Sequence, residues 1–199
     1  DCLTEEQIGY QDCITYPNVY VPEEYGTIQE GLDAAVPGDT VFVAAGTYYE
    51  NIEWPDIDNI MISGQGPDST IINGSLMDNP INGSVIRIMT DINDLYIDNL
   101  KLTGGSGTMV QIGTSWKYRG GAILNIGSDN VTIANCIIES NIAEAGFAIY
   151  SKNYSSEKFT IDNCKIMNHI TSQSQSVIDL NTSLSTSHRD SLFILNSRG

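Results

Sequence analysis

Apolar and polar positions alternate over short runs of this chain, and one such run occurs four times. Each copy has an apolar residue, a variable residue, an isoleucine, another variable residue and then an asparagine. Alternation with a period of two is typical of strands that bury one face. The four copies are Leu95–Leu102, Val131–Ile138, Phe159–Ile166 and Leu192–Gly199.

A second type of strand-like segment alternates with the first. Its copies are Ser84–Ile88, Gly121–Ile126, Gly146–Tyr150 and Ser176–Leu180. Such short strands cannot bury their apolar faces alone, but successive coils of a solenoid bury them by stacking. The pattern therefore predicts an all-β solenoid. A two-sheet sandwich would not keep asparagine at a fixed place, and a leucine-rich repeat would need a leucine pattern that is absent.

Stacked coils would make equivalent residues vertical neighbours, about 4.8 Å apart. Asparagine tolerates the left-handed backbone of a sharp corner, and its amide can bond to the next coil. Cys136 and Cys164 would share one core column, as stacked thiols or, alternatively, as a disulfide. The predicted asparagine ladder consists of Asn99, Asn135, Asn163 and Asn196.

The sequence of the N-terminal part predicts a short helix that would cover the open edge of the first coil. Thr27 and Glu30 form a capping-box pattern at the start of a short helix that would protect the open edge. Cys2 and Cys13 lie in a polar stretch with little core, where a disulfide between them would be useful. We therefore expect a disulfide-tied leader over residues 1–24 and a single domain over 25–199.

The segment from Tyr25 to Asn73 resembles the start of right-handed parallel β-helix proteins of the pectin-lyase-like superfamily. The resemblance implies a right-handed parallel β-helix and a function on polysaccharides, in a superfamily that includes lyases, polygalacturonases, methylesterases and phage tailspikes. The Gly-x-Tyr-x-Glu element also resembles one in pectin methylesterases. The shared motifs are Thr27-Ile-Gln, Pro37-Gly-Asp39, Gly46-Thr-Tyr-Tyr-Glu50 and Gly64-Gln-Gly66.

The resemblance does not extend to known catalytic signatures. The polygalacturonase motifs are missing, and Val177-Ile-Asp-Leu180 is a poor match to the methylesterase segment. We therefore expect Tyr48 and Glu50 to serve structure. If the protein is an enzyme, a polysaccharide lyase is the class that remains, and enzymatic activity is left open.

Charge narrows the range of partners. The chain has 25 acidic and 9 basic residues and a formal charge of −16. Phosphate backbones need clustered cations, so nucleic acid is excluded as a partner. No apolar run is long enough to span a membrane. The start without methionine and the interrupted last repeat predict a processed extracellular or cell-surface protein that continues beyond Gly199.

Two columns on the outward strand faces could bind substrate. Lys101, Lys165 and Arg198 would form a line of cations that could attract a uronate polymer and stabilise charge in a lyase reaction. Asp98 and Asp162 would stack in a neighbouring column and could bind Ca²⁺. The alternative is that these are ordinary solvated strand faces with weak ion pairs.

The longest connection carries Trp116-Lys117-Tyr118-Arg119, an aromatic residue beside cations. We expect it to form a sugar-stacking platform that works with the cation line. Alternatively, Trp116 packs over the coil edge, and Trp54 has the same ambiguity. The function predicted is binding or processing of a polysaccharide, acidic by preference. The alternative function is a non-catalytic stalk or adhesin module of a larger surface protein.

Overall fold

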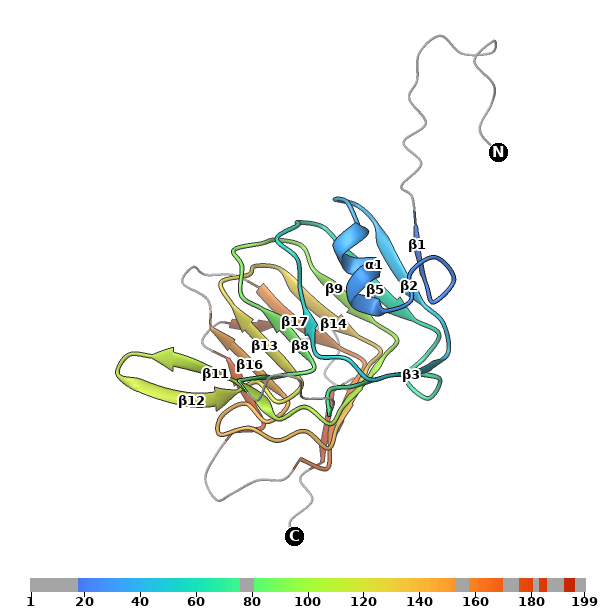
Figure 1. Ribbon diagram of the computed structural model, residues 1–199. Helices are drawn as coiled ribbons and strands as arrows, with labels where there is room; N and C mark the ends of the chain where they lie inside the picture. The colour runs from blue at the N-terminus through green and yellow to red at the C-terminus, as the bar shows by residue number, and fades with distance from the viewer. Residues whose placement is uncertain are drawn as a thin grey trace, which may run out of the picture.

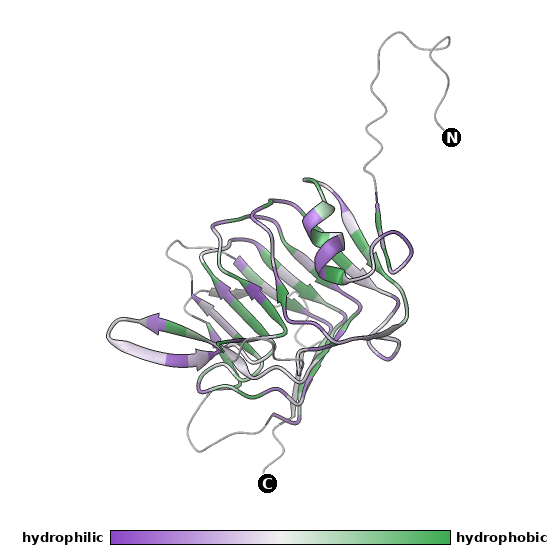
Figure 2. Cartoon of the chain, in the orientation of Figure 1, coloured by the Kyte–Doolittle hydropathy of each residue, from purple (hydrophilic) through white to green (hydrophobic). Residues whose placement is uncertain are grey.

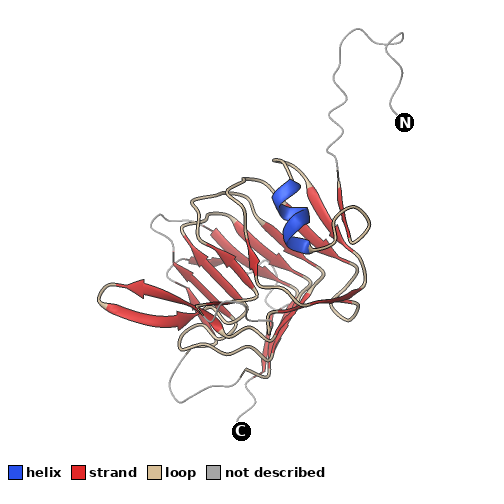
Figure 3. Cartoon of the chain, viewed as in Figure 1, coloured by secondary structure: helices blue, strands red, loops and turns tan. Residues whose placement is uncertain are grey.

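The computed structural model describes residues 18–75, 81–152, 158–169, 176–180, 183–185 and 192–195. Cys2 and Cys13, with their predicted disulfide, lie outside these residues. All elements of the described part are strands apart from helix α1 (Ile28–Ala34), as Figure 3 shows. That part of the chain has no helix long and apolar enough to cross a membrane.

Three parallel sheets, A, B and C, form the body of the molecule (Figure 1). Sheet A contains, in order, β1 (Val19–Val21), β2 (Thr40–Val43), β5 (Met61–Gly64), β9 (Tyr96–Asp98), β14 (Val131–Ala134), β17 (Lys158–Asp162) and β20 (Ser183–Ser185). Sheet B contains β3 (Gly46–Tyr48), β6 (Thr70–Asn73), β10 (Lys101–Thr103), β15 (Ile137–Glu139), β18 (Cys164–Met167) and β21 (Leu192–Leu195). Sheet C contains β4 (Ile52–Glu53), β8 (Ile86–Ile88), β13 (Ile123–Ile126), β16 (Ile149–Lys152) and β19 (Ile178–Leu180).

The chain visits sheets A, B and C in turn, and each round adds one coil. Consecutive coils pair in register: Leu102 lies beside Ile138, and Ile138 beside Ile166. Backbone hydrogen bonds therefore run between coils, as predicted from the repeat. A small antiparallel sheet D, made of β7 (Asn82–Gly83), β11 (Gly107–Ile112) and β12 (Ser115–Arg119), departs from this body (Figure 1).

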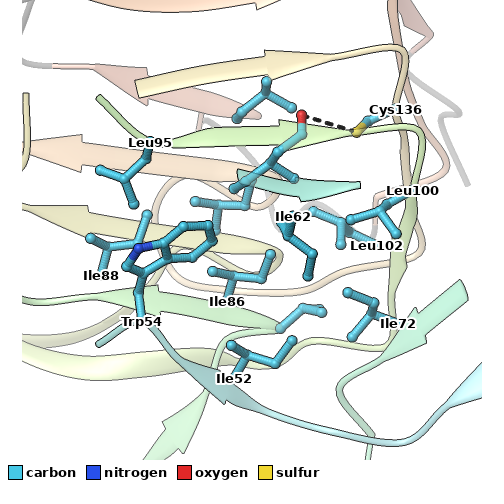
Figure 4. Packing of buried hydrophobic residues seen from close by; sticks show 14 of the residues in the cluster. Ile52, Trp54, Ile62, Ile72, Ile86, Ile88, Leu95, Leu100, Leu102 and Cys136 are labelled. Carbon is cyan, nitrogen blue, oxygen red and sulfur yellow. Dashed lines mark hydrogen bonds between the residues drawn. The ribbon is translucent and has the colours of Figure 1, made fainter. Parts of the chain in front are cut away.

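The core lies inside the coils, where alternate residues of all three sheets meet. Figure 2 shows hydrophobic and hydrophilic positions alternating along the strands. Isoleucine dominates the interior, and Trp54 is buried against Ile52, Ile86 and Ile88 (Figure 4). Trp54 is thus a core residue, which removes it from the candidates for sugar binding.

The corner from sheet A to sheet B carries the asparagine ladder. Asn99, Asn135 and Asn163 have left-handed φ angles of 56°, 50° and 47°. Asn163 Nδ2 donates to Asn135 Oδ1 at 2.7 Å, and Asn135 Nδ2 donates to Asp98 Oδ1 at 2.8 Å. The ladder is confirmed for these three residues, and its last acceptor is the carboxylate of Asp98 rather than an amide.

The other two corners also carry columns of residues with left-handed φ angles, which the repeat pattern did not predict. Before sheet A the column is Gly38, Asn59, Asp94 and Asn130, with φ between 51° and 99°. After sheet B it is Gly104, Ser140 and Asn168, with φ of 73°, 56° and 56°. Glycine, asparagine and aspartate adopt this conformation at low cost, so each coil turns sharply at the same three places.

The fourth copy of the recurring run is displaced from its expected place. Leu192 of β21 pairs with Cys164 in sheet B, whereas Leu184 of β20 takes the position beside Phe159 in sheet A. The two strand types share one alternation pattern, so the run fits either sheet. The register expected for this run is therefore not the one observed, and Asn196 and Arg198, expected in the ladder and above Lys165, lie outside the described residues.

Helix α1 covers the open end of the first coil, as predicted. Ile28 and Leu32 are fully buried, and Thr27 and Glu30 form the expected capping box. Glu50 accepts hydrogen bonds from the backbone N–H groups of Ile28 and Gln29, both at 3.0 Å. Glu50 therefore has the structural role expected for it. Strand β1, which the sequence places in the leader, pairs in parallel with β2.

Cys136 and Cys164 are free, buried thiols in neighbouring coils, as expected. Cys136 Sγ donates to the carbonyl of Ala134 at 3.0 Å, and Cys164 Sγ to that of Asp162 at 3.2 Å. Burial raises the pKa of the Cys136 thiol. The pair thus behaves as small core residues.

Candidate functional site

The predicted cation line lies on the outward face of sheet B. Lys101, Ile137 and Lys165 stack in one column. Lys101 Nζ lies 3.1 Å from Glu139 Oε1, so its charge already has a partner. The next position in the column belongs to Phe193 rather than to Arg198. The line therefore contributes one exposed cation, Lys165, among the described residues.

The two aspartates proposed for Ca²⁺ stack as expected, but Ala134 lies between them. Two coil steps separate Asp98 from Asp162 by about 10 Å, too far for one ion to contact both. Asp98 is nearly buried and accepts from the ladder amides of Asn99 and Asn135. Nowhere in the described chain do three or more His, Cys, Asp or Glu side chains group as metal ligands.

The aromatic segment forms strand β12 of a hairpin that projects from the coils (Figure 1). Gln111 pairs with Trp116 and Val110 with Lys117. Strand alternation places Trp116 and Tyr118 on one face of the hairpin, and Lys117 and Arg119 on the other. The Trp116 side chain is 61% exposed, so the alternative that it packs over the coil edge is wrong.

The base of the hairpin rests on the outward face of sheet C. Val110 packs against Leu124 and Tyr150 in a small hydrophobic cluster. The guanidinium carbon of Arg119 lies 4.7 Å from the centroid of the Tyr150 ring. A cation–π contact of this kind stabilises by about 0.5–2 kcal/mol and fixes the direction in which the hairpin leaves the coils. We call residues 107–119 the arm.

A hollow of about 340 Å³ lies between helix α1 and strand β7, beside sheet C. Arg87 stands in it, forming an ion pair with Glu53 and donating to Asn82 Oδ1 at 3.2 Å. Tyr49 lines the same hollow and is 55% exposed. The hollow therefore contains one exposed aromatic ring, one cation, the engaged carboxylates of Glu50 and Glu53, and several polar groups.

Cations are concentrated on sheet C and its arm. Of the nine basic residues in the chain, four belong to these elements, namely Arg87, Lys117, Arg119 and Lys152. Four carboxylates lie nearby, and three of them are engaged. Glu50 accepts from helix α1, Glu53 pairs with Arg87, and Glu144 Oε2 accepts from the backbone N–H of Tyr118 at 2.8 Å. The fourth, Asp179, lies beside Tyr150 in register. This face is more basic than the chain as a whole.

The arm and the cation line do not share a groove. Lys101 and Lys165 lie on sheet B, while the arm is anchored to sheet C. The hollow beside Lys165 is lined by ladder residues and Pro67, with none from the arm. The prediction that both sets contact one glycan together is therefore not supported by this geometry. Arg87 and Tyr150 were missed, although their polar positions in the second repeated segment signalled outward side chains.

Two solved structures share the fold of this chain. Pectin methylesterase from carrot aligns with a TM-score of 0.56 and 20% identity, over 88% of this chain and 52% of that one. Pectin methylesterase PemA from Erwinia chrysanthemi aligns with a TM-score of 0.59 and 12% identity, over 86% of this chain and 54% of that one. This chain thus spans about half the length of either enzyme.

No protein-family model and no curated protein sequence matches the chain. At identities of 20% and 12%, the two structures bear on architecture alone. Together with the parallel sheets and their register, they establish that this chain has the right-handed parallel β-helix fold of the pectin-lyase-like type.

Proposed function

We propose that this protein binds an acidic polysaccharide along the outward face of sheet C, with the arm as one wall of the site. The likeness in fold to two pectin methylesterases, whose names give pectin as their substrate, supports a carbohydrate ligand. A polymer of this kind lies outside the cell, so the proposal places the protein at the cell surface or in the extracellular space.

The arm is the observation that carries the proposal. Lys117 and Arg119 lie on the face of the arm toward sheet C, the exposed indole of Trp116 lies on its other face, and residues 107–119 include no carboxylate. The rest of the chain is strongly acidic, so this segment is where a polyanion meets the least repulsion. Lys117 would face a uronate carboxylate, and the indole of Trp116 would stack on a sugar ring where the polymer passes over the arm to its other face.

The reaction, if there is one, needs a base near the cations of this face. Glu53 is held by Arg87 and Glu50 by helix α1, so neither carboxylate is available to take a proton. Asp179 of β19, beside Tyr150, is the remaining carboxylate on these strands. With two of these carboxylates engaged, we consider two candidate functions, a polysaccharide-processing enzyme and a non-catalytic module of a larger surface protein, and the engagements favour the second.

Titration calorimetry with polygalacturonate tests the proposal. We expect Trp116→Ala and Lys117→Ala each to weaken binding by about three- to tenfold, and binding to weaken further as salt is raised. Lys165→Ala is the matched control, since it removes one exposed cation from sheet B instead. Equal loss in the Lys165 variant, or no binding by the unaltered protein, would contradict the proposal.

Product analysis separates the two candidates. The protein is incubated with pectin, alginate and polygalacturonate, with and without Ca²⁺. Release of methanol from pectin indicates an esterase, and an unsaturated uronide with its ultraviolet absorbance indicates a lyase. Binding without either product identifies the non-catalytic module.

A further inference from the structure

The outward face of sheet A carries three exposed aromatic rings that the sheet C site does not use. Tyr20 is 41% exposed, Phe42 38% and Tyr96 40%. Tyr20 and Phe42 are stacked, with ring centroids 5.6 Å apart and an angle of 19° between the ring planes. Tyr96 lies in a neighbouring outward column, two strand positions from that of Tyr20 and Phe42. Exposed aromatic rings gathered on one sheet face mark a contact surface.

A trough of about 560 Å³ runs across the coils beside Tyr96. One wall is the left-handed corner column of Asn59, Asp94 and Asn130. The floor is an outward column of sheet A, in which Met61, Tyr96 and Thr132 are neighbours in register. Thr40 and Thr160 extend the same lining toward the first and fifth coils. The trough is therefore elongated along the stacking direction, with the Tyr96 ring near its middle.

The chemical groups of the trough match the two kinds of surface that a sugar presents. Threonine hydroxyls, asparagine amides and a carboxylate bond to sugar hydroxyls. The aromatic ring covers the apolar C–H face. Asp39 also lines the trough and is only 2% exposed. Its Oδ2 accepts from the Val36 N–H at 2.8 Å, and its buried Oδ1 has no hydrogen-bond partner.

The charge on the outward face of sheet A determines whether a charged or an uncharged polysaccharide can bind there. Asp94 is in the trough wall, and Asp98 and Asp162 lie on the same sheet, against the single cation Lys158. Burial raises the pKa of the Tyr96 hydroxyl, and the negative charges of Asp98 and Asp162 raise it further. The local field is therefore negative, which disfavours a uronate polymer and leaves an uncharged one acceptable.

We propose that the outward face of sheet A is a second polysaccharide-binding surface, and that its ligand is an uncharged glycan. Phe42 and Tyr96 are two coils and two strand positions apart, about 12 Å between their Cα atoms by strand geometry. A chain of a few sugar rings would be long enough to contact both the Phe42 ring and the Tyr96 ring. The surface is separate from the sheet C site, so either proposal can fail without the other.

Affinity electrophoresis in native gels containing soluble neutral polysaccharides tests the proposal. The protein carries a formal charge of −16 and migrates strongly, whereas a neutral polymer stays in the gel. We expect galactomannan, hydroxyethyl cellulose or fully methyl-esterified pectin to retard the protein. Tyr96→Ala should raise the dissociation constant about tenfold and restore mobility, whereas Tyr96→Phe, which keeps the ring, should be retarded like the original.

Two further variants complete the test. Phe42→Ala should weaken retardation by a smaller factor, because Tyr20 remains beside it. Trp116→Ala should leave retardation by neutral polymers unchanged, which separates this surface from the sheet C site. The proposal is overturned if none of the three polymers retards the protein, or if Tyr96→Ala is retarded as strongly as the original. It is also overturned if Tyr96→Ala weakens binding to polygalacturonate to the same extent.

Discussion

The asparagine ladder allows a quantitative prediction for Asn135→Ala. Asn135 donates to the nearly buried carboxylate of Asp98 at 2.8 Å and accepts from Asn163 at 2.7 Å. The bond to the carboxylate is worth about 1.5–3 kcal/mol and the amide bond about 0.5–1 kcal/mol. Alanine at a φ of 50° adds strain of about 1 kcal/mol. We expect a loss of about 3–5 kcal/mol in the free energy of unfolding.

Two matched variants divide this loss into its parts. Asn135→Gly removes the same bonds without the steric strain, so it should be about 1 kcal/mol less destabilising than the alanine variant. Asn163→Ala has the same strain, at a φ of 47°, but loses only the bond to Asn135, so it should cost about 1.5–2 kcal/mol. Urea unfolding followed by circular dichroism measures all three. The reasoning is refuted if Asn163→Ala costs as much as Asn135→Ala, or if glycine is no better than alanine at 135.

Three other predictions concern the cap, a buried histidine and a coil contact. Glu50→Gln should destabilise by about 1–2 kcal/mol, because it removes the charge that accepts two helix N–H groups; calorimetric melting measures this, with the exposed Glu23→Gln as control. Burial lowers the pKa of His169, so the folded state disfavours the protonated imidazole. The free energy of unfolding should therefore be highest above about pH 6.5 and should fall as the pH decreases below it. This part of the pH dependence should vanish in His169→Gln. Gly121→Ala would place its Cβ 2.1 Å from the Phe147 carbonyl oxygen and should prevent stacking of two coils, visible as loss of the folded spectrum. Gly26→Ala, whose Cβ would meet only the Glu30 carboxylate at 3.4 Å, should fold.

Much of the coil register was predictable because the periodic residues recur without gaps in three consecutive coils. Leu95, Val131 and Phe159 begin runs of one length, and the structure aligns them as expected. The sheet predicted for the run at Leu192 was wrong, because the pattern specifies a half-buried strand but not the sheet to which that strand belongs. Strand β20, with only three residues, gave no comparable signal and occupies the sheet A position instead.

The candidate site was harder to predict because it depends on which faces meet. Trp116 and Lys117 are adjacent in sequence, yet strand alternation separates their side chains. The contact of Arg119 with Tyr150 joins an insertion to a coil that follows it, and no local pattern encodes such a pairing. Arg87 could have been noticed, since it holds the outward position that Leu124 and Tyr150 hold in the next two coils.

The connections from sheet B to sheet C differ greatly in length, from residues 49–51 in the first coil to 104–122 in the third. Strand β13 nevertheless resumes its alignment with β8 after the longest of them. This corner thus accommodates a long insertion, since the strands on either side are aligned by hydrogen bonds between coils and the arm packs on their outward face. The molecule could serve as a display scaffold, on which a foreign epitope or a recognition loop replaces the arm while the coils beneath keep their shape.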